Sequence, residues 1–144
     1  MRYIATGTGS DDDASWQRRL AEHRCRRPAT WQTVETAEVA GALRSDPNTA
    51  TVVDDMGGWL TGVLDRRGWD SPALDTDADD LVAAVAAFTG ALVLVSPEVG
   101  LTVVSATAAG RRFADEIGTL NQRLAQHCDR VVLVVAGQPM WVKP

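Results

Sequence analysis

Three stretches of the chain consist almost entirely of branched apolar residues, and mixed segments separate them. They are residues 49–54 (TATVVD), 91–96 (ALVLVS) and 131–136 (VVLVVA). Apolar runs of this kind are typical of strands buried on both faces of a parallel sheet. Two shorter runs that favour strands lie at 3–6 and 31–34. The pattern therefore predicts five short strands.

Apolar residues with helical spacing lie between these strands. The clearest case is residues 110–127, where apolar side chains recur at intervals of four, three and four residues: Phe113, Ile117, Leu120 and Leu124. Such intervals place side chains on one face of a helix. Shorter helices are expected at 14–24, 37–43, 59–64 and 81–88. Strands alternating with helices indicate the α/β class, with a mainly parallel sheet covered on both faces.

Two segments are expected to be loops. Residues 66–80 contain Gly68, Pro72 and five aspartates, so they predict a surface loop. Residues 97–109 predict a structured loop after the strand at 91–96. Gly137 is expected to end the last strand.

The composition fits one domain spanning residues 1–144. Apolar residues make up 45% and charged residues 23%, as in an ordinary soluble protein. The formal net charge of −5 argues against a general nucleic-acid partner. The longest apolar run, residues 81–88, is too short to span a membrane. With no secretory signal in its opening residues and two cysteines, the chain is expected to be cytoplasmic.

The lysine content excludes one nucleotide-binding motif. The single lysine is Lys143, near the carboxyl end. A phosphate-binding loop of the Walker A type needs a lysine directly after its glycines. The chain therefore contains no Walker A motif.

A basic segment stands out in this acidic chain. Residues 18–27 hold five of the 14 basic residues, which are Arg18, Arg19, Arg24, Arg26 and Arg27, and His23 lies among them. Arginine forks match phosphate oxygens. A histidine beside them can attack phosphorus, and nearby positive charge keeps its imidazole neutral. The alternative interpretation is a histidine at a helix end beside a solvated arginine face.

Carboxylates follow two of the predicted strands. Asp54 and Asp55 come at the end of the strand at 49–54, and Glu98 follows the strand at 91–96. Ligands of open α/β sheets bind at the carboxyl ends of the strands. A carboxylate there is a candidate Mg²⁺ ligand. Aspartates are also common turn residues, so this second interpretation stays open.

Two other motifs fail on spacing. Gly7-Thr8-Gly9 lacks the third glycine of a dinucleotide-binding fingerprint, because Asp12 stands in its place. A zinc site formed by His23, Cys25, His127 and Cys128 would need unusual ligand spacing.

Taken in order, several motifs resemble one known family. They are YIAT at 3–6, WxxRLxxHRxxRPxxWxTVE at 16–35, VVD with WLT at 52–54 and 59–61, VSxEVG at 95–100, GRxFxDxxGxLNQ at 110–122 and LVVAG at 133–137. Nearly the whole chain resembles the bifunctional adenosylcobinamide kinase / adenosylcobinamide-phosphate guanylyltransferase family of cobalamin biosynthesis.

The resemblance implies an activity and a fold. Members phosphorylate adenosylcobinamide with a nucleoside triphosphate, GTP or ATP. They then transfer GMP from GTP to adenosylcobinamide phosphate through a guanylylated histidine. Members have a RecA-like P-loop fold and assemble as homotrimers. Whether ATP or GTP would serve the kinase step stays open.

The resemblance also implies roles for individual residues. His23 matches the position of the catalytic histidine, and Asp54 matches a carboxylate that helps to hold Mg²⁺. Glu98 and Gly100 match a loop that binds nucleotide. The phosphate-binding arginines would be Arg19, Arg24 and Arg27.

One departure from the family pattern is large. The strand, P-loop and first helix that precede YIAT in the family, a unit of about 30 residues, have no counterpart in this sequence. Three explanations are open: a truncated reading of a longer protein, a natural short homologue without kinase activity, or a degenerate non-catalytic homologue that binds a nucleotide or a partner. Without a P-loop, kinase activity of this chain is doubtful.

Overall fold

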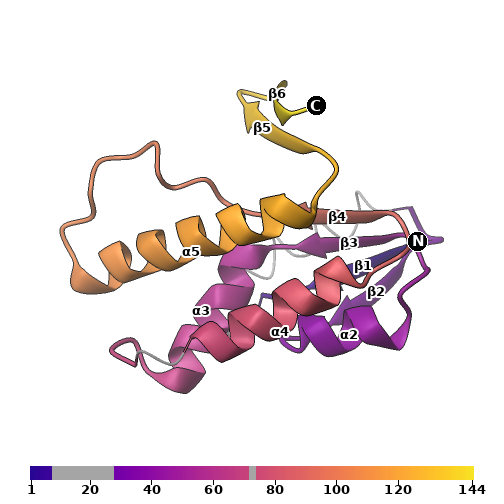
Figure 1. Ribbon diagram of the computed structural model, residues 1–144, viewed down its shortest axis with the longest axis horizontal. Helices are drawn as coiled ribbons and strands as arrows, with labels where there is room; N and C mark the ends of the chain where they lie inside the picture. Colours follow the sequence, from indigo (N-terminus) through magenta and orange to yellow (C-terminus); the bar gives the residue numbers. More distant parts are fainter. Residues whose placement is uncertain (8–27, 72–73) are drawn as a thin grey trace.

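A four-stranded parallel sheet lies beside the helices of the molecule (Figure 1). The computed structural model describes residues 1–7, 28–71 and 74–144. The strands lie in the order β2-β1-β3-β4. Their bounds are β1 (Arg2–Ala5), β2 (Gln32–Glu35), β3 (Thr51–Asp54) and β4 (Leu92–Val95). The parallel α/β class predicted from the apolar runs is confirmed.

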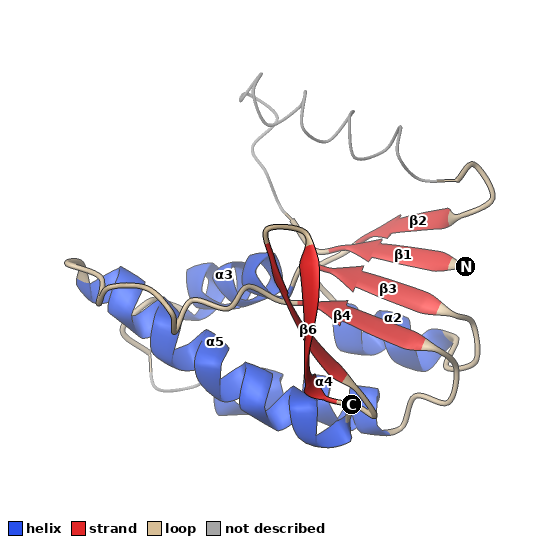
Figure 2. Ribbon diagram, turned by 90° about the horizontal axis from the view of Figure 1, so that it is seen from above, coloured by secondary structure: helices blue, strands red, loops and turns tan. Residues whose placement is uncertain are grey.

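Four helices of the described chain pack on one face of this sheet, as Figure 2 shows. They are α2 (Val39–Ser45), α3 (Met56–Arg67), α4 (Asp75–Ala86) and α5 (Ala108–His127). Side chains alternate between the faces of a strand. Ile4 and Val53 point into the helix layer and are fully buried, and Leu94 packs against the same core.

The described helices cover one face, while the covering expected on the other face depends on residues 14–24, which lie outside the described residues. Connections between parallel strands are right-handed, so successive crossovers in one direction put their helices on one face. The crossovers from β2 to β3 and from β3 to β4 run in one direction along the sheet. On the other face, Val93 and Val95 of β4 are exposed.

The last apolar run does not join the parallel sheet. β5 (Val131–Val135) pairs antiparallel with β6 (Gln138–Lys143), a strand that the sequence did not predict. Ala136 and Gly137 between them both have positive φ, 51° and 73°. Two such residues make the type I′ turn of a tight hairpin. Gly137 therefore reverses the chain, and Figure 1 shows the hairpin beyond the end of α5.

Helix α4 begins earlier than expected. Its first residues were predicted to be part of a surface loop because aspartates are poor helix formers. Aspartates in a first helical turn, however, interact favourably with the helix dipole. In addition, Asp77, Asp79 and Asp80 form ion pairs with Arg67, Arg123 and Arg44, respectively. These arginines come from three other helices, so the segment is fixed by tertiary contacts.

Helix α3 also begins earlier, at Met56, and includes Gly57 and Gly58. The Asp55 carboxylate accepts a hydrogen bond from the Gly58 backbone N–H at 2.5 Å and so caps the helix. Gly57 lies against the loop after β4, since a Cβ there would be 2.9 Å from Pro97 Cγ. The glycine pair therefore permits a close contact within a helix that is regular from its first turn.

A candidate ligand site at the carboxyl ends of the strands

The parallel register brings the carboxyl ends of the strands to one edge of the sheet. Ala5 is paired with both Glu35 and Asp54, and Asp54 is paired with Val95. The residues after the strands, among them Thr6 and Ser96, continue from this edge. Open α/β sheets bind ligands here because loops and helix N-termini converge on it.

Asp54 is the central carboxylate of this edge. Its side chain is half-buried and accepts a hydrogen bond from the Tyr3 hydroxyl. Tyr3 itself is buried, with 7% of its surface exposed. Alternation along the strands places both side chains on the sheet face opposite the described helices.

Asp55 has a structural role instead. Its carboxylate caps α3, and its backbone N–H donates to Thr6 Oγ1 at 3.0 Å. The Thr6 hydroxyl in turn donates to the Asp55 carbonyl at 2.5 Å. This reciprocal pair joins the end of β1 to the start of α3. Of the two adjacent aspartates, Asp54 is thus the one whose carboxylate is not used as a helix cap.

Glu98 and Gly100 lie together in the loop between β4 and α5. Glu98 Oε1 accepts a hydrogen bond from the Gly100 backbone N–H at 2.7 Å. A Cβ at Gly100 would lie 2.8 Å from the same oxygen, so a larger residue there would displace the Glu98 carboxylate from this position. Both residues are exposed. The contact of Pro97 with Gly57 brings this loop to the start of α3.

Asn121 of α5 fixes the start of the same loop. Its side-chain amide donates to the Pro97 carbonyl at 3.1 Å, and its oxygen accepts from the Ser96 hydroxyl at 2.5 Å. The sequence marked Asn121 as part of a motif without indicating this contact. It gave no role to Tyr3 or Thr6, because only the pairing of β1 with β3 places them beside Asp54 and Asp55.

His23, Arg19, Arg24 and Arg27 lie outside the described residues. The structure therefore does not bear on the predicted histidine or on the predicted phosphate-binding arginines. The segment that carries them follows directly after Gly7, which leaves the sheet at the Asp54 edge.

The donor set can be compared with the needs of Mg²⁺. Among the described residues, no group of three or more histidine, cysteine, aspartate or glutamate side chains is arranged to hold a metal. Mg²⁺ at nucleotide sites, however, is bound by one or two carboxylates together with phosphate oxygens and water. The single carboxylate of Asp54 is enough for this kind of Mg²⁺ binding. Burial raises the pKa of the Cys128 thiol.

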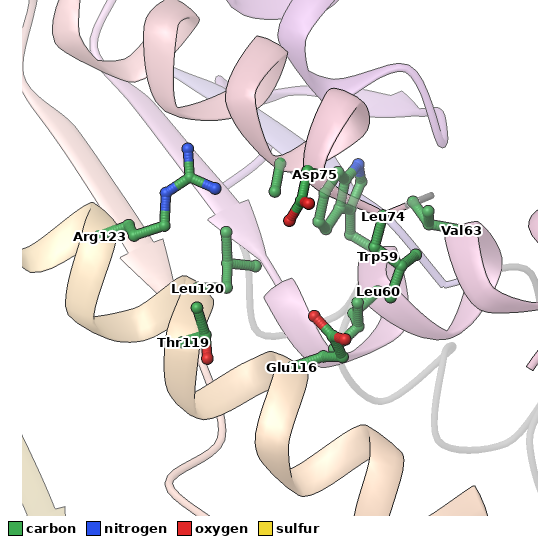
Figure 3. Close-up of a pocket in the computed structure, with 10 residues that line it drawn as sticks. Trp59, Leu60, Val63, Leu74, Asp75, Glu116, Thr119, Leu120 and Arg123 are labelled. Carbon is green, nitrogen blue, oxygen red and sulfur yellow. The ribbon is translucent and has the colours of Figure 1, made fainter. Parts of the chain in front are cut away.

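A small cavity in the helix layer is not a substrate site. It lies among α3, α4 and α5 and has a volume of about 20 Å³, with Trp59, Leu60 and Leu120 in its wall (Figure 3). That is room for about one water molecule, whereas small-molecule pockets measure roughly 300–1,000 Å³. Figure 3 shows the charged groups of Asp75, Glu116 and Arg123 around this space.

Fold and site together define an α/β protein of the ligand-binding type, with an acidic residue at the carboxyl edge of a parallel sheet. The family model "cobinamide kinase / cobinamide phosphate guanyltransferase" matches residues 1–142. The chain belongs to this family, and the resemblance drawn from the sequence motifs is confirmed. No described helix is long and apolar enough to cross a membrane.

Individual relatives agree with the family match. The chain is similar to a bifunctional adenosylcobalamin biosynthesis protein, CobP, of Pseudomonas aeruginosa, with 40% identity over 99% of this chain and 82% of the relative. It is also similar to the bifunctional adenosylcobalamin biosynthesis proteins CobU of Salmonella typhimurium and Escherichia coli. These are 33% and 31% identical over 98% of this chain and 84% of each relative.

Proposed function

We propose that this chain transfers GMP from GTP to adenosylcobinamide phosphate through a guanylylated His23. The observation that carries the proposal is the family match, which spans residues 1–142 and therefore includes both His23 and Asp54. The half-buried Asp54 carboxylate at the edge where such sheets bind ligands supports it further.

In the first step, an unprotonated imidazole nitrogen of His23 attacks the α-phosphorus of GTP. A P–N bond forms, the bond between the α-phosphorus and the oxygen bridging to the β-phosphate breaks, and pyrophosphate leaves. The guanidinium groups of Arg19, Arg24 and Arg27 balance the negative charge that develops on the phosphates.

In the second step, a phosphate oxygen of adenosylcobinamide phosphate attacks the same phosphorus. The P–N bond breaks, the histidine is regenerated and adenosylcobinamide-GDP is released. The covalent intermediate divides one transfer between two bulky substrates into two displacements, which is the usual advantage of nucleophilic catalysis.

Asp54 would hold Mg²⁺ against the triphosphate, and the metal would neutralise charge on the leaving pyrophosphate. Glu98 and Gly100 would border the nucleotide from the neighbouring loop. Their mutual hydrogen bond holds the turn in one shape before a ligand arrives, which lowers the entropy lost on binding.

The kinase step of the family would need a lysine beside the nucleotide phosphates. The single lysine, Lys143, lies in β6 and donates to the carbonyls of Ala125 and Cys128. Lys143 is therefore bound to the end of α5 rather than placed in a glycine-rich loop, and without a P-loop the phosphorylation of adenosylcobinamide by this chain with GTP or ATP is doubtful. From the family resemblance we also propose a RecA-like sheet, a homotrimer and a cytoplasmic location.

The test is covalent labelling with α-³²P-GTP and Mg²⁺, followed by denaturation. A phosphohistidine-type label survives base and is lost in acid. We expect a label that His23→Ala abolishes and that adenosylcobinamide phosphate removes as adenosylcobinamide-GDP. His127→Ala is the matched control, because it removes the chain's other histidine, and it should leave the label intact.

Two results contradict the proposal. A label that persists in His23→Ala means that His23 is not the nucleophile. GTP binding without any label in the unaltered chain favours a non-catalytic nucleotide-binding homologue.

A further inference from the structure

Tyr3 and Asp54 are diagonal neighbours on two paired strands. In the register of β1 with β3, Tyr3 lies beside Val52 and Ala5 lies beside Asp54. Residues two apart along a strand share a face, so Tyr3 and Asp54 point to the same side of the sheet. An aromatic side chain is long enough to span such a diagonal, and the Tyr3 hydroxyl donates to Asp54 Oδ2.

The hydroxyl is placed for Asp54 and is not needed for packing alone. The ring of Tyr3 is buried, with 7% of its surface exposed, and phenylalanine would fill the same space. A buried tyrosine hydroxyl requires a hydrogen-bond partner. Its partner here is a carboxylate at the ligand-binding edge of the sheet.

The contact with Tyr3 uses one oxygen of the Asp54 carboxylate. Oδ2 accepts from Tyr3, whereas no side chain or backbone group of the described residues donates to Oδ1. The Asp54 backbone is fixed as well, because its carbonyl accepts from the Thr6 N–H at 3.1 Å. Asp54 is thus fixed at its main-chain carbonyl and at Oδ2. These two hydrogen bonds also set the orientation of Oδ1.

We propose that Tyr3 is a positioning residue that holds the Asp54 carboxylate in the orientation needed to bind the nucleotide-bound divalent cation. The inference rests on the proposed function, since it concerns the same site. Hydrogen-bond partners of metal ligands fix ligand orientation, and their loss typically costs 10–100-fold in metal affinity or activity. Tyr3 does not contact the reacting atoms and acts through Asp54.

The test compares Tyr3→Phe with the unaltered chain, because phenylalanine retains the ring and removes the hydroxyl alone. Free Mn²⁺ is measured by electron paramagnetic resonance during titration in the presence of GTP. We expect Tyr3→Phe to weaken Mn²⁺ binding about tenfold or more. The Mg²⁺ concentration that half-saturates histidine labelling should rise by a similar factor, with labelling restored at high Mg²⁺.

Thr51→Val is the matched control. Thr51 is a buried residue of the same strand, and its hydroxyl accepts from Arg2 Nε at 3.2 Å at the opposite end of β3. Its substitution removes a buried hydroxyl far along the strand from Asp54, so it should lower stability without changing the metal dependence.

The outcomes separate this inference from the proposed function. Equal Mn²⁺ affinity in Tyr3→Phe and the unaltered chain makes Tyr3 a packing residue and overturns the inference, whether or not labelling occurs. Weaker Mn²⁺ binding in Tyr3→Phe with no label in any variant supports the inference and overturns the covalent mechanism. An unaltered chain that binds no Mn²⁺ with GTP overturns the metal role of Asp54 and this inference with it.

Discussion

Asn121 of α5 donates its side-chain amide to the Pro97 carbonyl at 3.1 Å and thereby joins the longest helix to the loop that carries Glu98. The oxygen of the same amide accepts from the Ser96 hydroxyl, so one side chain holds two consecutive residues of the loop. A residue in the helix layer therefore determines the shape of a segment at the carboxyl edge of the sheet.

Asn121→Ala should release this loop. Two hydrogen bonds are lost, and we expect a loss in unfolding free energy of about 1–3 kcal/mol. The GTP concentration that half-saturates histidine labelling should rise more than the maximal labelling rate falls. Urea unfolding and labelling at several GTP concentrations measure the two effects. The control is Gln122→Ala, an exposed neighbour on the same helix; equal effects from both variants would argue against a specific role for Asn121.

Substitutions of the two adjacent aspartates should have different effects, on stability for Asp55 and on labelling for Asp54. Asp55→Ala removes the cap of α3 and should cost about 1 kcal/mol of unfolding free energy, whereas Asp55→Asn keeps a good cap and should cost much less. Asp54→Asn leaves that cap intact and should abolish Mg²⁺-dependent labelling. Urea unfolding and labelling of the three variants test this. Asp55→Asn losing the label while Asp54→Asn retains it would reverse the assignment.

Two glycines of α3 should respond with opposite signs to alanine. Alanine is favoured over glycine by about 1 kcal/mol within a helix. At Gly62, an added Cβ would meet only the flexible end of Arg66 at 3.7 Å, so Gly62→Ala should stabilise the protein by up to that amount. At Gly57, the Cβ would lie 2.9 Å from Pro97 Cγ, and Gly57→Ala should destabilise it. Thermal unfolding measures both; a stabilising Gly57→Ala would show that the loop at Pro97 moves freely.

The ion pair between Arg44 and Asp80 predicts a pH dependence. Arg44 Nη2 is 2.6 Å from Asp80 Oδ1, and this hydrogen bond lowers the pKa of Asp80. A carboxyl group with a lowered pKa stabilises the folded state above its ordinary pKa of 3.8, and this contribution is lost as the pH falls through the lower folded-state value. Because the pair is exposed, the effect is small.

The stability difference between Arg44→Ala and the unaltered chain should therefore be present at pH 7 and shrink in acid below the ordinary carboxyl pKa. Thermal unfolding in Asp80→Asn background is the control, since Arg44→Ala should have little effect there at any pH. A difference that stays constant down to acid pH would point to packing by the arginine stem instead.

The sequence predicted the strands of the parallel sheet because a short run of apolar or β-branched residues is enough to indicate a strand. It missed β6 because Pro139, Trp141 and the polar ends of that strand give no clear alternation, and because the turn at Gly137 depends on φ angles. The aspartates at the start of α4 were misassigned for another reason. Their partners, such as Arg44 and Arg123, are distant in the sequence, so no local pattern contains them.

The candidate site was predicted in part. Asp54 and Asp55 have the same residue type at a strand end, and composition cannot tell which one caps the next helix. That distinction depends on where each carboxylate points. Alternation from Val52 to Asp54 places Asp54 on the Tyr3 face, but only the register of β1 with β3 shows that the two strands are neighbours.

The strand order has a consequence for how the chain folds. β1 lies inside the sheet although it precedes both of its partners, and Arg2 pairs with Gln32 and Thr51, 30 and 49 residues later. Pairings with such sequence separation form slowly, since the intervening chain must close first. During synthesis β1 emerges from the ribosome well before either neighbour exists. The pairing of β1 with both of its neighbours therefore becomes possible only after Asp54 has been added.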